Sequence, residues 1–276
     1  MQVYSPHTAV DCAPGGLGDW LADIVTGEPT TEEEAEEGPE EPQDEQPQPQ
    51  PKAPNEDDPF LSPPKRPSYM LQHHPSQLSI RDKALHLNNS KHTRVPIHAC
   101  KVSGYEKTGA GMGRIVRFSS PQPLLSIIDR IGLGLGNPRG FPIAIPQGKE
   151  ASDINISSVA ICAGSGGSLF SGLHDVDLLF TGELSHHEAL AAIESGKCVI
   201  TLFHSNTERG FLHSVLKTQL EETVAQEWEK LRAEEKKKQG LDEDYYEALE
   251  DDHVEIQVSE VDRDPYGIMI NKTELQ

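Results

Sequence analysis

The segment "VAICAGSGGSLFSGLHDVDLLFTGELSHHEALAAIESGKCVITLF", residues 159–203, alternates strand-like and helix-like patterns. Its three apolar runs, "VAICAG", "VDLLFTG" and "KCVITLF", are short and rich in branched residues, which is typical of strands buried on both faces. A helix opens at "SGGSLFSGL" and another covers "SHHEALAAIESG". Strands that alternate with helices through short connections predict an α/β fold, with a largely parallel sheet in this region.

The second of these helices has clear signals at both ends. Ser185 can cap its start, Glu188 completes a capping box three residues later, and Gly196 can end it.

The flanking sequence continues the pattern. Towards the amino terminus, Val3 and Tyr4 predict a strand, and "APGGLGDWLADIV" predicts a helix that stops at Gly27. Further strands are expected at "RVPIHACKV", "GRIVRFSS" and "GFPIAIP", with a hairpin or bulge at "GAGMG" and a helix at "PLLSIIDRIGLGL". After residue 203, leucines and a tryptophan about four apart predict a long charged helix at about 206–239, and "VEIQVSE" predicts a last strand.

Residues 28–92 interrupt the pattern. Between Glu28 and Asp58 there are 13 acidic residues and one lysine, Lys52, a local charge of −12 within a net charge of −21. The segment is rich in proline and glutamine and too poor in apolar residues to offset the entropy of ordering. We therefore predict a disordered acidic insertion at 28–92, between a strand plus helix at 1–27 and an α/β remainder at 93–276. The insertion is a solvated tether or a docking site for a basic partner.

Composition also narrows the class of protein. The acidic balance argues against direct nucleic-acid binding, which needs a basic surface. The four widely spaced cysteines predict buried free thiols in a reducing compartment. No run is long and apolar enough to span a membrane, and no apolar signal opens the chain. We expect no membrane association and a cytoplasmic protein, with nucleus and mitochondrial matrix left open.

His204 and Glu208 stand four residues apart where the last buried strand gives way to a helix. At this spacing an imidazole and a carboxylate share one helix face and can hold a divalent metal. The carboxyl ends of strands are also where open α/β sheets bind ligands. The alternative is a capped helix with a surface ion pair between Glu208 and Arg209.

Other candidate groups are weaker. His7 and Asp11 follow the predicted first strand, although an aspartate near a turn is usually a cap. The glycine-rich "AGSGGSLF" at 163–170 is either a tight strand-to-helix turn or an anion contact, and the turn is favoured. Among Glu183, His186 and His187, adjacent histidines diverge on a helix, so only one could line a pocket.

Several stretches together resemble one family. They are "YSPHTAVDCAPGGLGDWLA", "GAGMGRIVRF", "VAICAGSGGSLF", "DLLFTGELSHHEAL", "CVITLFHSNTERGFL" and "SEVDRDP", in family order. The family is the dinuclear-metal family known both as GTP cyclohydrolase type 2 homologue and as NGG-one-interacting factor three-like (Nif-three-like), in its eukaryotic, fungal-type branch. The resemblance covers most of the chain outside the insertion and the charged end of the long helix.

The resemblance implies Nif-three-like mixed sheets flanked by helices, assembled into toroidal homo-oligomers that are often hexamers. Asp11 matches an aspartate ligand of the family's first half, His204 a histidine ligand of its second half, and Glu208 the glutamate that helps to hold two divalent metal ions.

One part of the family pattern has no match in its expected place. The family's amino-terminal section, with a strand-end histidine motif (HHP or YHP), should precede "YSPHTAVD". The "HHP" at 73–75, with His73 and His74, follows Asp11 within the predicted insertion, and we interpret it as a coincidence. We therefore expect a chain that lacks the family's first section and has incomplete metal occupancy.

Two functions follow as hypotheses. The first is a metal-dependent, hydrolase-like protein of unknown substrate, in which Asp11, His204 and Glu208 hold metal and His7 or His187 acts as general base. The second is a non-catalytic protein that binds a transcription-related partner, as the family's other name implies.

Overall fold

The structure of the protein is a computed structural model that describes residues 2–27, 90–101, 109–238, 242–261 and 264–268. All but the last three residues of the predicted insertion, and with them His73 and His74, lie outside these ranges. Of the last three, Ser90 is buried and its hydroxyl donates to Gln122 Oε1, while His92 begins the first strand.

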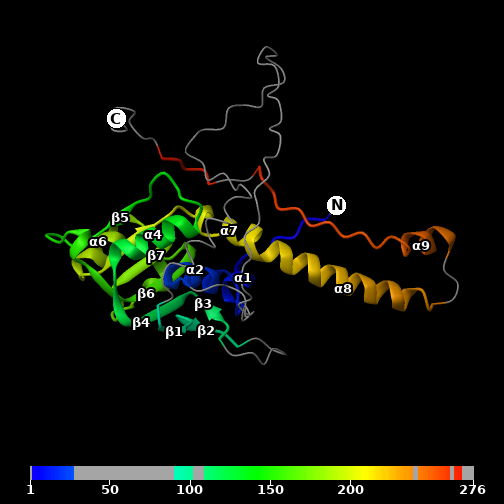
Figure 1. The fold of residues 1–276 in the computed structure, drawn as a ribbon, viewed down its shortest axis with the longest axis horizontal. Coiled ribbons are helices and arrows are strands. Elements are labelled where there is room, and N and C mark those ends of the chain that lie inside the picture. Colours follow the sequence, from blue (N-terminus) through cyan, green and yellow to red (C-terminus); the bar gives the residue numbers. More distant parts are fainter. Residues whose placement is uncertain (1, 28–89, 102–108, 239–241, 262–263, 269–276) are drawn as a thin grey trace, which may run out of the picture.

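A six-stranded mixed sheet organises the described part of the chain (Figure 1), in the order β1-β4-β6-β7-β8-β5. Strands β6, β7 and β8 run parallel, as predicted for residues 159–203, and the remaining neighbours pair antiparallel. A two-stranded ribbon, β2-β3, lies apart from this sheet. The strands are β1 (His92–Val95), β2 (His98–Ala99), β3 (Gly111–Met112), β4 (Arg114–Pro123), β5 (Ile143–Ala144), β6 (Asn155–Ser165), β7 (Leu178–Glu183) and β8 (Cys198–Thr201).

Helices lie on both sides of the sheet, which confirms the predicted α/β class with a mixed sheet flanked by helices. Helix α6 has the predicted capping box at Ser185 and Glu188, and α2 ends at Gly27 in the left-handed conformation. The helices are α1 (Thr8–Cys12), α2 (Leu17–Thr26), α4 (Leu124–Gly134), η1 (Ala151–Asp153), α5 (Gly167–Phe170), α6 (His186–Glu194), η2 (Ser205–Thr207), α7 (Arg209–Phe211), the π-helical η3 (Leu212–Leu216), α8 (Lys217–Glu235) and α9 (Glu243–Ala248).

The two faces of the sheet bury different clusters, because alternate residues of a strand point to opposite faces. On one face α2 and α4 contribute Trp20, Leu21 and Ile127 to the larger cluster, which also contains Val159 and Ile161 of β6. The other face carries a smaller cluster of Ala160, Cys162, Leu169, Phe170, Val176, Leu179, Ala192 and Val199. Helix α2, from the first 27 residues, is therefore part of the main core.

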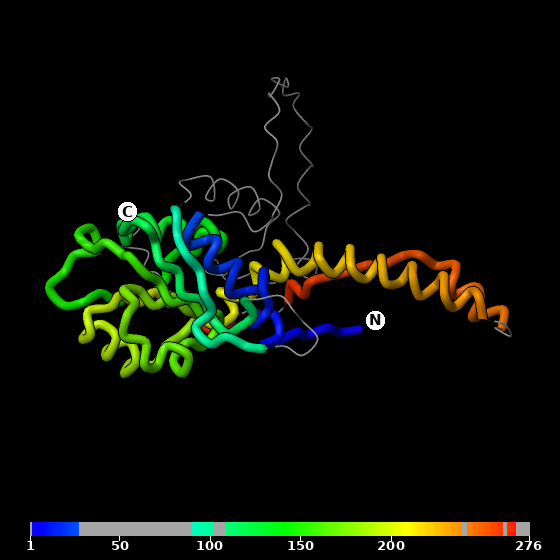
Figure 2. The backbone as a smooth tube through the Cα atoms, turned by 90° about the horizontal axis from the view of Figure 1, so that it is seen from below, coloured from blue at the N-terminus to red at the C-terminus, as the bar shows by residue number. Residues whose placement is uncertain are grey.

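Helix α8 leaves the sheet and projects from the rest of the described chain (Figures 1 and 2). No residue of α8 is buried, and the segment after α9 runs back beside it. Trp228 Nε1 donates to the Asp251 carbonyl and Arg209 Nη2 to the Ser259 carbonyl, which fixes both ends of this return segment. None of the described helices, the 19-residue α8 included, is long and apolar enough to cross a membrane.

Three predictions about local structure are wrong. Val3 and Tyr4 are not in a strand, and their exposed fractions of 86% and 66% show that neither packs against the sheet. "VEIQVSE" is not a strand either; its alternate residues are half-buried along α8 without ladder partners among the described residues. Cys162 and Cys198 are buried free thiols as predicted, but Cys12 is only half-buried and Cys100 is exposed.

Candidate functional site

The carboxyl ends of the three parallel strands bring together the residues on which the candidate site is built. Gly164 lies at the end of β6, Glu183 ends β7, and His204 follows β8 by three residues. Adjacent parallel strands end at the same edge of a sheet, which is where open α/β folds bind ligands.

His204 lies between two carboxylates. Its Nδ1 is 2.8 Å from Glu183 Oε1, and its Nε2 is 3.4 Å from Glu208 Oε1. Glu183 therefore accepts a hydrogen bond from Nδ1, and in the neutral ring this leaves Nε2 as a lone-pair donor on the Glu208 side. The predicted pairing of His204 with Glu208 at i, i+4 is present in the structure, although the intervening residues form the short η2 rather than a regular α-helix.

Gly164 lies directly under this pair. A Cβ at Gly164 would come within 2.8 Å of both His204 Nε2 and Glu208 Oε1, and the backbone there has φ +60°. Thr207 holds the glycine in place, because its hydroxyl accepts from the Gly164 N–H at 2.9 Å and donates to the His204 carbonyl at 2.8 Å. The chain thus keeps an open position where the imidazole and the carboxylate face each other.

Asp11 approaches the pair from a different element than predicted. It lies in helix α1 instead of following a strand, and it is half-buried. Burial raises the pKa of its carboxyl, and the charges of His7 and His204 oppose that shift. His7 is exposed just before α1, with φ 49°.

The charges of the site are coupled. Burial raises the pKa of Glu208; His204 lowers it and the Asp11 carboxylate raises it again. The hydrogen bond to Glu183 raises the pKa of His204 against partial burial, with further contributions from the charges of Glu208, Glu183 and Asp264. Burial, followed by the charges of Asp11 and Glu208, raises the pKa of the Cys162 thiol to about 12.

The donors fit a metal ion in part. Within the described ranges, no three or more His, Cys, Asp or Glu side chains are grouped closely enough to hold a metal. Asp11 is therefore near enough to affect the pKa of Glu208, but it does not complete a ligand set with His204 and Glu208. Two ligand atoms, His204 Nε2 and Glu208 Oε1, face each other above an open glycine, and these two do suit a divalent cation.

Several other candidates lie elsewhere. The rings of His186 and His187 are 5.5 Å apart and meet edge-to-face on the exposed start of α6. The alternative for Glu208 predicts a surface ion pair with Arg209. Arg209 is instead buried and donates to the Ser259 carbonyl, and Glu208 faces His204. "AGSGGSLF" forms a tight turn into α5, which has a single helical turn, as the favoured interpretation predicts.

Three contributions to the site were not predicted. The role of Glu183 as hydrogen-bond acceptor for His204, the clamp formed by Thr207, and the hydrogen bond from the Ser205 N–H to Asp264 Oδ2 all join residues from different elements. The sequence signal for them is that Glu183, Ser205, Thr207 and Asp264 lie in the stretches "DLLFTGELSHHEAL", "CVITLFHSNTERGFL" and "SEVDRDP" that carry the family resemblance.

Comparison with known proteins defines the family. Residues 1–239 match the family described as Duf34/NIF3 (NGG1p interacting factor 3). The chain belongs to this family, and its relatives from yeasts and animals place it in a eukaryotic branch, as the resemblance indicated.

Two yeast relatives illustrate this membership. "NGG1-interacting factor 3" of Saccharomyces cerevisiae is 32% identical over 223 residues, which cover 80% of this chain and 56% of the relative. "Protein NIF3 homolog" of Schizosaccharomyces pombe is 31% identical over 220 residues, with 80% and 55% covered. The chain thus spans about half the length of these relatives. Among solved structures, the Bacillus cereus protein related to NIF3 is 16% identical over 81% of this chain and 68% of its own, with a TM-score of 0.42.

Proposed function

We propose that the protein binds a divalent cation at the carboxyl ends of β6, β7 and β8, through His204 and Glu208. The observation that carries this proposal is the hydrogen bond between His204 Nδ1 and Glu183 Oε1 at 2.8 Å. Histidines that bind metals commonly donate their other ring N–H to a carboxylate, which fixes the tautomer and the ring orientation. Here that orientation directs Nε2 to Glu208.

The balance of charge supports the same proposal. Four carboxylates, of Asp11, Glu183, Glu208 and Asp264, act on the site or on its histidine, against the two imidazoles of His7 and His204. A bound cation would compensate this excess of negative charge. Asp11 is the proposed third ligand, and its half-buried carboxylate in α1 would have to approach the pair.

On this basis we propose a hydrolase-like function with an unassigned substrate. A divalent cation supplies Lewis-acid chemistry towards a substrate oxygen or a water. Glu183 keeps the proton on His204 Nδ1, and Gly164 leaves open the space beside His204 Nε2 and Glu208 Oε1 that a side chain would occupy. His7 is favoured over His187 as general base, because it lies near enough to Asp11 and Glu208 to influence the pKa of both carboxyls.

Calorimetric titration with Zn²⁺ and with Co²⁺ tests the cation site. Wild-type protein should bind saturably, and His204→Ala and Glu208→Gln should abolish that binding. Glu183→Gln should weaken it by about 10- to 100-fold, as for other second-sphere partners of metal-bound histidines. Glu222→Gln, on the exposed surface of α8, is the control. Equal binding by wild type, His204→Ala and Glu208→Gln would refute the proposal.

The second candidate is a protein that binds a transcription-related partner, and two observations favour it. One yeast relative carries the name "NGG1-interacting factor 3", and helix α8 offers a projecting surface with no buried residue. Binding of yeast NGG1 to wild-type, Asp11→Asn and Glu208→Gln protein separates the two functions. If the protein is an adaptor, the wild type and both variants should bind the partner equally. If it is a hydrolase, both variants should lose metal-dependent turnover.

The homo-oligomer expected from the family resemblance also remains a proposal. Light scattering of the purified chain measures it directly.

A further inference from the structure

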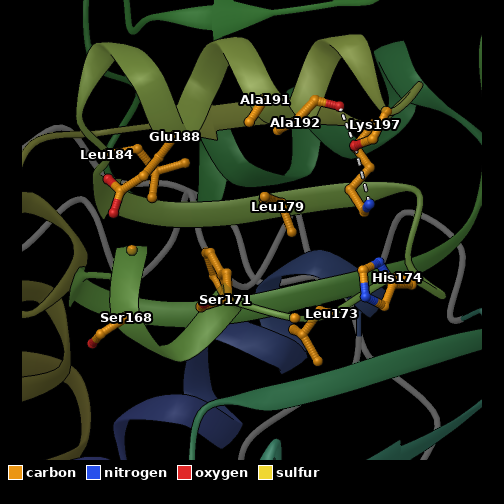
Figure 3. Close-up of a pocket in the computed structure, with 14 residues that line it drawn as sticks. Ser168, Ser171, Leu173, His174, Leu179, Leu184, Glu188, Ala191, Ala192 and Lys197 are labelled. Atoms are coloured by element: carbon orange, nitrogen blue, oxygen red, sulfur yellow. Dashed lines mark hydrogen bonds between the residues drawn. The ribbon is translucent and has the colours of Figure 1, made fainter.

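The face of the sheet that carries the smaller buried cluster contains a cavity of about 510 Å³ between the α5 turn and helix α6 (Figure 3). This size is within the range of cavities that bind small organic molecules. The cavity shares none of the residues of the candidate cation site, because it is not lined by Gly164, Glu183, His204 or Glu208.

A buried lysine lies at one end of this cavity. Lys197 is only 8% exposed, and its Nζ donates to Ser195 Oγ at 3.2 Å. No carboxylate in the described part of the chain forms an ion pair with Lys197, although a buried charge is normally paired. Its ammonium group therefore has unused hydrogen-bonding capacity towards the cavity.

The remainder of the lining is polarised from end to end. Figure 3 shows His174 at the same end as Lys197, and Glu188 and Ser168 at the opposite end. The remaining lining is mostly apolar and includes Leu173, Leu179, Leu184, Phe170, Ala191 and Ala192. The Glu188 carboxylate is already engaged, because it accepts a hydrogen bond from the Ser185 N–H at 2.7 Å in the helix cap.

We propose that this cavity binds a small organic anion with an apolar body. The anionic group pairs with Lys197, next to His174, and the apolar body lies against Leu179 and Leu173. Such a ligand supplies the negative charge that Lys197 does not receive from the described chain, and it covers the half-buried Leu173 and Leu184. The reverse orientation would place the anion against Glu188, where like charges repel.

Two fluorescent probes that differ in one charged group test the proposal. They are 8-anilinonaphthalene-1-sulfonate, an anion, and N-phenyl-1-naphthylamine, which has the same aromatic system without the sulfonate. The sulfonate probe should bind wild-type protein saturably and more tightly than the neutral probe. Lys197→Met should weaken the sulfonate probe by at least about tenfold, as expected for a charged hydrogen bond, and leave the neutral probe within about twofold.

Further variants separate loss of binding from loss of folding. His174→Ala changes an exposed side chain at the Lys197 end of the cavity. This variant should fold normally and should weaken the binding of the sulfonate probe only. Ala191→Phe, at an exposed position of α6 that lines the cavity, should occupy part of the cavity and weaken the binding of both probes. Lys230→Gln, on the exposed surface of α8, is the charge-matched control and should change neither.

The proposal is overturned if His174→Ala and Ala191→Phe, with melting temperatures equal to wild type, bind the sulfonate probe as wild type does. It is also overturned if a folded Lys197→Met variant loses affinity for both probes equally, because Lys197 would then have no role specific to the anion.

Discussion

At the scale of single residues, the most constrained polar contact is an arginine that joins the first 27 residues to the sheet. Arg114, the first residue of β4, is 1% exposed, and its Nε and Nη2 bind the two carboxylate oxygens of Asp19 at 2.6 and 2.7 Å. Its Nη1 donates to the carbonyls of Gly111 and Gly113. Removal of the carboxylate would leave a buried cation without its counter-ion.

We therefore predict that Asp19→Ala lowers the free energy of unfolding by about 3–5 kcal/mol, the range seen when one partner of a buried ion pair is deleted. Asp175→Ala removes the partner of Arg117 in an exposed pair and should cost at most about 1 kcal/mol. Urea denaturation of both variants measures the difference, and equal losses would show that burial of Arg114 does not matter.

Asp19 should also contribute to the acid sensitivity of the fold. Burial alone would raise its pKa, but the hydrogen bonds and charge of Arg114 outweigh burial, so the pKa lies below its usual 3.8. A carboxyl with a lowered pKa in the folded state stabilises the protein above its unfolded pKa, and this is lost as pH falls through the folded value. Below about pH 3.8, therefore, the gap in unfolding free energy between wild type and Asp19→Ala should shrink. Urea denaturation repeated across this pH range tests it, and a constant gap would contradict the lowered pKa.

Gly164 should be more sensitive to a methyl group than other glycines of the same backbone conformation. Gly164→Ala places a Cβ 2.8 Å from His204 Nε2 and Glu208 Oε1, whereas Gly148→Ala, at φ +77°, meets nothing within 4 Å. Both variants carry the strain of a positive φ, of about 1 kcal/mol, so only Gly164→Ala should also lose Zn²⁺ binding. Calorimetry after a check of the melting temperature compares them, and equal Zn²⁺ binding would remove Gly164 from the site.

At the scale of elements, the sequence predicts best where the signals are local. The ends of α6 follow from Ser185, Glu188 and Gly196, because these residues lie in the helix or within two positions of its ends. Alternation of apolar residues is less specific, because it indicates one covered face and not the partner that covers it. Residues 254–258 alternate in burial in a segment that runs beside α8 (Figures 1 and 2), so the predicted strand is wrong although its burial pattern is right.

Helix α8 should unfold locally without loss of the core. Ala225→Pro breaks the middle of a helix that has no buried residue, so it should reduce helicity and speed amide exchange in α8. The melting temperature of the sheet should stay within error. Ala22→Pro, in the buried helix α2, is the matched change and should unfold the protein. A large loss of core stability in Ala225→Pro would show that α8 and the sheet fold as one unit.

At the scale of the whole molecule, the fold class followed from residues 159–203, but the candidate site followed only in part. His204 and Glu208 could be paired from sequence, because spacing along one turn sets their separation. The distance of Asp11 from them depends on how α1 packs, and no local pattern encodes that. The partnership of Glu183 with His204 depends in the same way on the order of strands in the sheet.

Helix α2 shares its core with strands that begin more than sixty positions later in the chain. The free energy needed to close such a connection grows only with the logarithm of its length, by about 0.6 kcal/mol per doubling. Variants with longer or shorter connections between Gly27 and Ser90 should therefore melt at nearly the same temperature. A protein severed once in this interval would become a two-piece complex, held together by the contacts of Trp20 and Asp19. Its melting temperature would then depend on concentration, and it would rise as the concentration of the two pieces is increased.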